Sequence, residues 1–271
     1  MSINKKRIFF WVKIFVIIYC GGGISLYYLQ ETFLFHPKKL SADHVFDFKI
    51  PFKEVQIPVN KTDTISLVKF FPTGSVSKGV LVYYHGNMEN VEYYEHFVSA
   101  FTRYGYEVWM PDYPGYGKST GDRTEKKMYD EAWLVQRMAM NMFHSDSITI
   151  YGKSLGTGIA AYAASASRCK QLILETPYYS ITNLFNHYAF MYPVSMMIKY
   201  KIPTWQFLED VKVPVTIFHG TNDKIIPYSC AEKLQGSMKP GDQFITIPGG
   251  SHNDLTNFES YQHVMDSLLL Q

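Results

Sequence analysis

The sequence contains little cysteine, and the cysteines it has are widely spread. Its 271 residues include three, Cys20, Cys169 and Cys230, with no close spacing between any two of them. This pattern predicts neither a disulfide framework nor a zinc site. We expect Cys169 and Cys230 to be two buried thiols, although a single bridge between them is also compatible with the sequence.

An excess of charge of either sign is also missing. The chain has 26 Lys and Arg residues against 24 Asp and Glu residues, a formal net charge of +2. No basic stripe alternates with aromatic residues, so we expect no nucleic-acid partner. No internal repeat or low-complexity segment is present, and 46% of the residues are hydrophobic. The composition is that of a globular protein and excludes a disordered chain.

The N-terminal region differs in composition from the rest of the chain. Basic residues at positions 5 to 7 precede an apolar run over residues 8–29. Its length is near the roughly 20 residues that a helix needs to cross a bilayer. We therefore predict three segments before the folded domain: a cytoplasmic basic leader over 1–7, a transmembrane signal anchor over 8–29 and a linker over 30–52.

Two alternatives to the anchor are a cleaved signal peptide and a buried helix of the domain. No clear small-x-small cleavage site follows the apolar run, which weakens the first alternative. Basic residues before the span favour a single-pass protein whose domain lies on the non-cytoplasmic side of the membrane. Lys38 and Lys39, just after the span, weaken this orientation.

Short β-rich runs alternate with helical stretches from about residue 53 onward. This alternation predicts an α/β domain over 53–271, with a mostly parallel central sheet and helices on both faces. Ligands bind at the carboxyl ends of the strands in such sheets. We expect a leading hairpin over 53–59 and 64–71, strands over 79–84, 106–110, 147–151, 171–174, 213–218 and 243–247, and helices from Asn90 and over 124–143, 155–166 and 255–269.

The stretch over 178–206 does not fit this alternation. It is rich in Tyr, Phe and Met and is broken by Pro193 and Pro203. One prediction is a helical crossover and loop that pack on the sheet. The other is a small cap whose adaptable side chains line an apolar substrate pocket or contact a lipid surface. The sequence leaves both open.

The candidate nucleophile lies in Gly152-Lys153-Ser154-Leu155-Gly156, which matches the pattern G-x-S-x-G. The match follows an apolar predicted strand and precedes a helix rich in glycine and alanine. A sharp turn between such a strand and helix exposes a serine hydroxyl. The helix N-terminus also presents backbone N–H groups to a developing oxyanion. We therefore predict Ser154 as a nucleophile.

A serine hydroxyl is a weak nucleophile and needs a base that a third group orients. In chains with this motif the partners follow in the order Ser, then Asp or Glu, then His. Asp223 follows the predicted strand over 213–218, and His252 lies in the last loop before the C-terminal helix. We predict Asp223 as the acid and His252 as the base. Glu175, at the end of the strand over 171–174, is the alternative acid.

Two backbone N–H groups are candidates for an oxyanion hole. His85-Gly86-Asn87 ends the first buried strand, where a loop supplies one donor while the residue after the nucleophile supplies the other. We therefore predict the N–H groups of Asn87 and Leu155. His85, like His219, precedes a glycine at a strand end and is expected to be a turn histidine bonded to the backbone.

Together these segments resemble the signature blocks of the α/β-hydrolase superfamily, over roughly residues 50–270. The chain is most similar to the small, often membrane-anchored branch that includes protein-depalmitoylating thioesterases and serine aminopeptidase-like hydrolases. The resemblance implies the same roles for Ser154, Asp223 and His252. The glycines and proline of the 112–119 loop are expected to fix a wall of the site. The matching blocks are 85–90, 112–119, 152–156, 174–177, 219–227 and 249–254.

These roles predict a serine hydrolase that cleaves a carboxylic ester or thioester through an acyl-serine intermediate, with no metal or organic cofactor. The predicted anchor and the aromatic stretch favour a small-molecule or lipid-like substrate with an apolar acyl group. The alternatives are a peptide or amide hydrolase of the serine aminopeptidase type and a non-catalytic adaptor that binds a partner through the same pocket. The natural substrate and the oligomeric state are left open.

Overall fold

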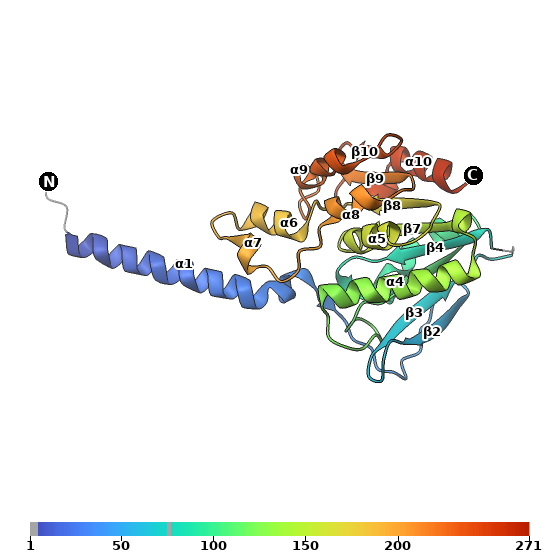
Figure 1. Cartoon of the computed structure of the whole chain (residues 1–271), viewed down its shortest axis with the longest axis horizontal. Helices are drawn as coiled ribbons and strands as arrows, with labels where there is room; N and C mark the ends of the chain where they lie inside the picture. The colour runs from blue at the N-terminus through green and yellow to red at the C-terminus, as the bar shows by residue number, and fades with distance from the viewer. Residues whose placement is uncertain (1–4, 75–76, 271) are drawn as a thin grey trace.

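An eight-stranded mixed sheet lies at the centre of the fold (Figure 1). A computed structural model of the chain describes residues 5–74 and 77–270; residues 1–4 of the predicted leader and residue 271 lie outside them. The strands of the sheet are β2 (Phe52–Pro58), β3 (Thr64–Phe70), β4 (Gly79–Tyr84), β6 (Tyr106–Pro111), β7 (Ile148–Lys153), β8 (Gln171–Glu175), β9 (Val215–Gly220) and β10 (Gln243–Ile247). Their order across the sheet is β10-β9-β8-β7-β4-β6-β3-β2. The β2–β3 and β3–β6 pairs are antiparallel, and the other neighbouring pairs are parallel.

The inner strands are apolar on both faces because helices cover both. All six residues of β4 are buried. Val80 and Val82 pack into one core cluster, and Leu81 and Tyr83 pack into the other. A continuous apolar run is the pattern of a parallel strand that is buried on both sides.

Two helical layers cover the sheet (Figure 1). One contains α4 (Glu125–Met142), α5 (Gly156–Ser165) and α8 (Thr204–Asp210), whose apolar residues join the first cluster. The other contains α2 (Val91–Tyr94), α3 (Ser99–Thr102) and α10 (Glu259–Leu269). Further helices are α6 (Ile181–Tyr188), α7 (Val194–Met197) and α9 (Tyr228–Ala231), with 3₁₀ turns at Glu95–Phe97, Ser145–Ser147, Glu232–Ser237 and Leu255–Asn257.

Most predicted strands and helices lie within two residues of the observed bounds, but two helices differ. The helix predicted from Asn90 consists of three short pieces: α2, a 3₁₀ turn and α3. Asn90 caps the first piece, since its side chain accepts a hydrogen bond from the backbone N–H two residues on. The helix predicted over 255–269 is divided at Phe258, whose extended backbone separates a 3₁₀ turn from α10. Cys169 and Cys230 are free and buried, which confirms that prediction.

Helix α1 (Lys5–Leu34) projects away from the sheet and its helical layers (Figure 1). Among the described residues it is the one helix long and apolar enough to cross a membrane. It extends beyond the predicted span over 8–29 at both ends. After α1, β1 (His36–Pro37) pairs in parallel with β5 (Met88–Glu89), which lies in the segment after β4. The chain that leaves α1 is therefore tied to the carboxyl edge of the sheet.

Candidate active site

Ser154 lies in the sharp turn between β7 and α5, where its motif predicts it. Its φ is +53°, and such a sparsely populated backbone conformation costs a residue with a Cβ about 1–3 kcal/mol. Its N–H donates to the Glu175 carbonyl at 2.9 Å, and its carbonyl accepts from the Thr157 N–H at 3.0 Å. A Cβ on Gly156 would lie 2.0 Å from the Tyr84 carbonyl oxygen. Only glycine therefore lets the first turn of α5 approach the sheet this closely.

The structure brings Ser154, Asp223 and His252 into one hydrogen-bonded line. His252 Nδ1 lies 2.7 Å from Asp223 Oδ2, and His252 Nε2 lies 2.9 Å from Ser154 Oγ. Because an ionised carboxylate can only accept, Nδ1 carries the proton and donates to Asp223. Nε2 of the neutral imidazole is then the acceptor, so the Ser154 hydroxyl donates to it. A nucleophile, a base and an orienting acid require this arrangement.

Asp223 is buried in the loop after β9. Burial acts to raise its pKa, but the hydrogen bond and the charge of His252 outweigh burial and hold the pKa of Asp223 below its usual value. The backbone N–H groups of Ile225 and Ile226 each donate to Asp223 Oδ1 at 2.8 Å. These contacts fix the carboxylate in its ionised form with Oδ2 directed at His252.

The loop that carries His252 packs directly on the loop that carries Asp223. The Asn222 N–H donates to the Gly250 carbonyl at 2.9 Å. A Cβ on Gly220 would lie 2.1 Å from the same carbonyl oxygen, so the two chains approach as closely as glycine allows. Backbone contacts between the two loops therefore set the separation of His252 from Asp223.

A second buried polar cluster lies behind the nucleophile. Lys153 and Glu175 form an ion pair whose side chains are 3% and 2% exposed, and Glu175 also accepts hydrogen bonds from Tyr151 and Tyr261. Burial acts to raise the pKa of Glu175, but the charge of Lys153 outweighs it and holds that pKa below its usual value. Lys153 Nζ also reaches the His252 carbonyl oxygen at 3.4 Å. Glu175, the alternative acid, is thus paired with Lys153 and not with the His252 imidazole.

The two candidate oxyanion donors, Asn87 and Leu155, line the same pocket as Ser154. Within the part of the chain that the structure describes, neither backbone N–H donates to a protein acceptor. The Asn87 side chain donates to the Leu34 carbonyl at 3.1 Å, and the Asn87 carbonyl accepts from the His36 N–H at 3.0 Å. The end of α1 therefore positions the loop that offers one of these donors.

His85 and His219 are bonded to the backbone, as predicted. His85 Nδ1 lies 2.7 Å from the Gly86 carbonyl oxygen. His219 Nε2 lies 2.9 Å from the Ile226 carbonyl oxygen and 3.6 Å from Asp223 Oδ2. Burial lowers the pKa of His219, which favours a neutral imidazole beside Asp223. Neither histidine reaches Ser154.

The loop over 112–119 was expected to wall the site, but it supports the Asn87 segment from behind. Tyr113 Oη donates to the His85 carbonyl at 2.6 Å, and Tyr116 Oη donates to the Asn87 carbonyl at 2.9 Å. The described residues that line the pocket beside Ser154 include none from this loop. The rings of both tyrosines are buried in the core, and their hydroxyl groups reach the carbonyl groups just after β4 from there.

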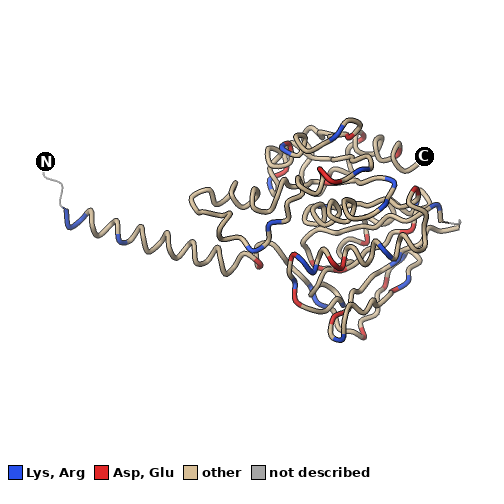
Figure 2. Tube along the Cα trace, in the orientation of Figure 1, with Lys and Arg blue, Asp and Glu red and all other residues tan. Residues whose placement is uncertain are grey.

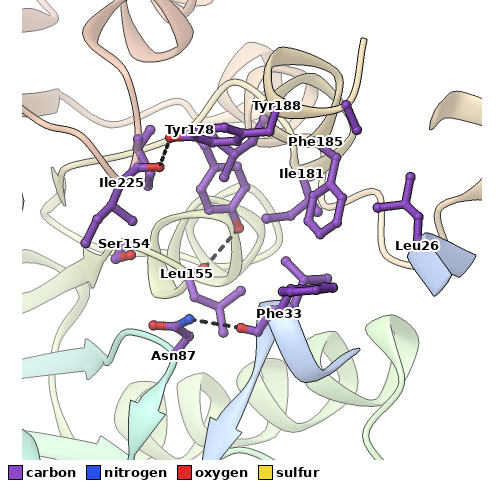
Figure 3. A pocket seen from close by; sticks show the side chains of 14 residues that line it. Leu26, Phe33, Asn87, Ser154, Leu155, Tyr178, Ile181, Phe185, Tyr188 and Ile225 are labelled. Carbon is purple, nitrogen blue, oxygen red and sulfur yellow. Dashed lines mark hydrogen bonds between the residues drawn. The ribbon is translucent and has the colours of Figure 1, made fainter. Parts of the chain in front are cut away.

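An apolar pocket of about 430 Å³ extends from Ser154 to helix α1 (Figure 3). Its volume is within the range of small-molecule sites. Tyr178 Oη donates to the Leu155 carbonyl at 3.0 Å across one side of the pocket. The lining residues are Leu26, Phe33 and Leu34 of α1, then Asn87, Ser154 and Leu155, then Tyr178, Ile181, Leu184, Phe185, Tyr188 and Ala189 in or beside α6, and Ile225 and Ile226.

Sequence reasoning missed the contribution of α1 to this pocket. Leu26 lies inside the predicted membrane span, and Phe33 and Leu34 lie in the predicted linker. Gly22, Leu26 and Gln30 recur at helical spacing, but only the structure shows that they form the covered side of α1, since all three are buried or half-buried there. A uniformly apolar helix does not otherwise reveal which of its sides another part of the chain covers.

Metal-ligating side chains do not gather around this pocket. Among residues 5–74 and 77–270, no group of three or more His, Cys, Asp and Glu is placed to hold a metal ion. Ser154 lines the pocket, and His252 and Asp223 reach it through the hydrogen bonds that end at the Ser154 hydroxyl.

Comparison with known families and curated proteins points to one group. A profile of the family described as alpha/beta hydrolase fold matches residues 79–205. Alpha/beta hydrolase domain-containing protein 17C of Mus musculus is 26% identical over 189 residues, which cover 68% of this chain and 58% of that protein. The Xenopus laevis protein of the same name is 27% identical over 189 residues, with 68% and 59% covered. The match spans less than two thirds of the length of these relatives.

Solved structures resemble the chain over most of its length. An esterase of Pyrococcus furiosus superposes with a TM-score of 0.66 at 16% identity, covering 88% of this chain and 99% of that one. A cold-adapted esterase from an Arctic intertidal metagenomic library superposes with a TM-score of 0.63 at 15% identity, covering 84% and 97%. At such identities the superpositions establish the fold and confirm the predicted fold class.

Proposed function

Because the chain belongs to the α/β-hydrolase superfamily, we propose that it is a serine hydrolase that cleaves a carboxylic ester or thioester with an apolar acyl group. The observation that carries this proposal is the hydrogen-bonded line from Asp223 through His252 to Ser154. That line opens on a pocket whose other lining residues are mostly apolar. Such a pocket favours an apolar group on the acyl side of the bond that is cleaved.

Acylation begins when Ser154 Oγ attacks the acyl carbonyl carbon. His252 Nε2 takes the hydroxyl proton as the new C–O bond forms, and Asp223 stabilises the resulting imidazolium. The carbonyl π electrons move to oxygen and give a tetrahedral oxyanion. When that oxyanion collapses, the bond to the leaving alcohol or thiol breaks, and His252 gives it the proton.

The backbone N–H groups of Asn87 and Leu155 are the proposed donors to the oxyanion. Their freedom from other protein acceptors supports this role. Loss of one such donor costs about 2.7–4 kcal/mol of transition-state stabilisation. Water then hydrolyses the acyl-serine by the same steps, with His252 again as base.

We also propose that residues 8–29 anchor the protein in a membrane as a single span. The length and apolar composition of α1 support this anchor. The basic residues at positions 5 to 7 support an orientation with the hydrolase domain, over 53–271, on the non-cytoplasmic side. The linker over 30–52 and the cap over 178–206 complete the proposed organisation.

A substrate panel on the purified full chain tests the proposal. It contains p-nitrophenyl esters of short and long acyl chains, a palmitoyl thioester and an aminoacyl-arylamide, each with Ser154→Ala as the control. We expect turnover of esters or thioesters, higher kcat/KM for long acyl chains than for short ones, and none above background in Ser154→Ala. Turnover of the arylamide alone would instead identify an aminopeptidase-type enzyme.

A further inference from the structure

The turn between α6 and α7 exposes apolar side chains beside helix α1. Residues 188–197, called the tip below, include Tyr188, Phe190, Met191 and Met196, which are 58%, 75%, 56% and 84% exposed. The tip lies at the end of the molecule from which α1 projects (Figure 1). Single exposed apolar residues are ordinary on a protein surface, but a cluster of them marks an interaction site.

Specific contacts hold the tip on α1. Tyr19 Oη donates to the Met191 carbonyl at 2.8 Å, and the rings of Tyr19 and Tyr192 stack with centroids 4.7 Å apart. Tyr192 Oη donates back to the Tyr19 carbonyl at 3.2 Å. Gly22 leaves room for this ring, since a Cβ there would lie 2.2 Å from Tyr192 Oη. The tip and the middle of α1 therefore form one continuous surface.

Neither α1 nor the tip carries a charged residue where the two segments meet. No Asp, Glu, Lys or Arg occurs from residue 14 to residue 30 of α1, or from residue 176 to residue 198. The first charged residues after these two stretches, Glu31 and Lys199, lie 3.8 Å apart as an ion pair. In Figure 2 the basic residues of α1 lie toward its N-terminal end, and the rest of α1 and the tip beside it carry no charge up to the junction with the rest of the protein. This ion pair marks the boundary between an uncharged surface and the charged body.

Part of the tip backbone is also paired in the way that lipid requires. In hydrocarbon, backbone groups must find hydrogen-bond partners within the protein. The Tyr192 N–H donates to the Ala189 carbonyl at 2.9 Å, and the Val194 N–H donates to the Tyr192 carbonyl at 2.8 Å. The Met191 carbonyl accepts the Tyr19 hydroxyl. These groups of the turn are therefore satisfied without water.

Helix geometry gives the depth of the tip relative to the membrane. If the apolar core begins at Ile8, a thickness of about 30 Å takes about 20 residues and ends near residue 27. Tyr19 then lies about 12 Å inside that boundary, at a rise of about 1.5 Å per residue. The Met191–Tyr192 end of the tip, which is bonded to Tyr19, lies at a comparable depth. The other end lies nearer the boundary, because the Gln30 side chain donates to the Met197 carbonyl at 3.2 Å. Leu26, which lines the pocket, lies at the boundary itself.

We propose that the tip is immersed in the same membrane leaflet as the C-terminal half of α1, so that the pocket opens to lipid. Leu26 and Phe185 line both the pocket and a small cavity between α1 and α7. Apolar surface therefore continues from the lipid to Ser154. The substrate class that fits this geometry is an ester or thioester whose acyl chain stays in the bilayer until it enters the pocket. This inference rests on the proposed membrane anchor and on the proposed hydrolase.

Depth measurements on the full chain in phosphatidylcholine vesicles test the immersion. Cys20 is the exposed native cysteine of α1, whereas Cys169 and Cys230 are buried, so an environment-sensitive fluorophore on Cys20 reports the depth of α1. Cys20→Ser with Met196→Cys places the same label on the tip. Quenching by spin-labelled lipid is compared with quenching by iodide in the water.

The matched control is Cys20→Ser with Met142→Cys. Met142 is 61% exposed and is the last residue of α4, about 25 Å along that helix from Glu125. Glu125 at the N-terminus of α4 contacts the Lys201 N–H, close to the uncharged boundary. The control therefore carries the same substitution on an exposed methionine far from the tip.

We expect lipid quenching at positions 20 and 196 and iodide quenching at position 142. Lipid quenching at position 20 with iodide quenching at position 196 would overturn the immersion while leaving the anchor intact. A label at position 196 shielded from both quenchers would show that a second copy covers the tip, which also overturns it. If position 20 escapes lipid quenching, the anchor fails and the immersion with it. Hydrolysis of a soluble short-chain ester by the same samples reports separately on the proposed chemistry.

Met196→Glu, compared with Met142→Glu, tests entry from the lipid. A carboxylate on a short side chain is costly inside a membrane. Turnover of a long-chain acyl ester carried in vesicles should fall about tenfold in Met196→Glu. This corresponds to an about tenfold weaker partitioning of the tip into the membrane. Turnover of a soluble short-chain ester should not change in either variant. Unchanged turnover of the vesicle substrate, or equal losses on both substrates, would overturn entry through the lipid.

Discussion

The two walls of the pocket are built in different ways. The catalytic wall consists of the loops that carry Ser154, Asp223 and His252, and backbone hydrogen bonds join them at the strand ends, as between Asn222 and Gly250. The apolar wall consists of α1 and residues 178–189. Side chains from segments about 150 residues apart meet there, chiefly by apolar contact. The comparison teaches that the sheet fixes the geometry of the proposed triad, whereas the shape of the proposed acyl pocket depends on packing between distant segments.

The largest effect is expected where the catalytic wall loses its acid. Asp223→Asn cannot hold the His252 imidazole in the tautomer that accepts the Ser154 proton, so kcat should fall by about 10⁴. Glu175→Gln, which alters a carboxylate paired with Lys153, should lower kcat much less. Steady-state kinetics on a soluble ester, corrected for the folded fraction, measure both. The reverse order of losses would make Glu175 the acid.

The next effect concerns the polar cluster behind the catalytic wall. Glu175→Gln leaves the buried Lys153 charge without its partner, which should cost about 3–5 kcal/mol of unfolding free energy. Replacing both residues by apolar ones should recover part of that loss. Denaturant unfolding of the detergent-solubilised chain measures these values.

Asp130→Asn serves as the control for that stability loss. It breaks the Lys126–Asp130 pair, whose side chains are 84% and 53% exposed, and should change stability by less than about 1 kcal/mol. If Glu175→Gln costs no more than Asp130→Asn, the buried pair does not support the nucleophile turn in the way described.

A smaller, selective effect is expected at the apolar wall. Leu26→Trp fills part of the pocket from the α1 side, so kcat/KM for long acyl esters should fall about tenfold or more. Short acyl esters, which need only the region near Ser154, should keep their kcat/KM. Val45→Trp, at an exposed site, is the control. Equal losses on short and long esters would mean that α1 does not select the acyl chain.

The smallest effect is expected in the pH dependence of stability, through the carboxylates of Asp223 and Glu175. Asp223 and Glu175 both have pKa values lowered in the folded chain. Their stabilising contribution is therefore complete above the unfolded-state values, near about pH 4, and is lost as the pH falls through the folded-state values. Between neutral pH and about pH 5, the contribution of these two groups should stay constant.

Thermal unfolding of the wild type and of Asp223→Asn over a range of pH checks this. The Tm difference between them should be constant near neutral pH and shrink in acid. A difference that already shrinks well above about pH 5 would contradict the lowered pKa of Asp223.

The catalytic wall could be predicted from sequence because its signals are local. Ser154 lies in a motif whose glycines are required by close backbone approaches, such as the 2.0 Å that a Cβ on Gly156 would leave to the Tyr84 carbonyl oxygen. Asp223 and His252 follow predicted strand ends, and parallel strands bring their carboxyl ends to one edge. The order of strands in the sheet was not needed for that inference.

The apolar wall could not be predicted in the same way. Leu26 and Phe33 reach the pocket because the chain after α1 pairs with the segment after β4 and because α1 contacts the tip, and no local pattern encodes either contact. The ion pair of Lys153 could not be predicted either, because its partner Glu175 comes from the next strand across the sheet. Contacts of this kind depend on tertiary packing, which periodicity does not report.

The most direct test of the central claim is covalent labelling of the full chain with a fluorophosphonate probe, followed by mass spectrometry. We predict a single adduct on Ser154, sharply slower labelling in Asp223→Asn, and no adduct in folded Ser154→Ala. A folded wild type that stays unlabelled, as expected of a non-catalytic adaptor, or an adduct that persists in Ser154→Ala would contradict the account.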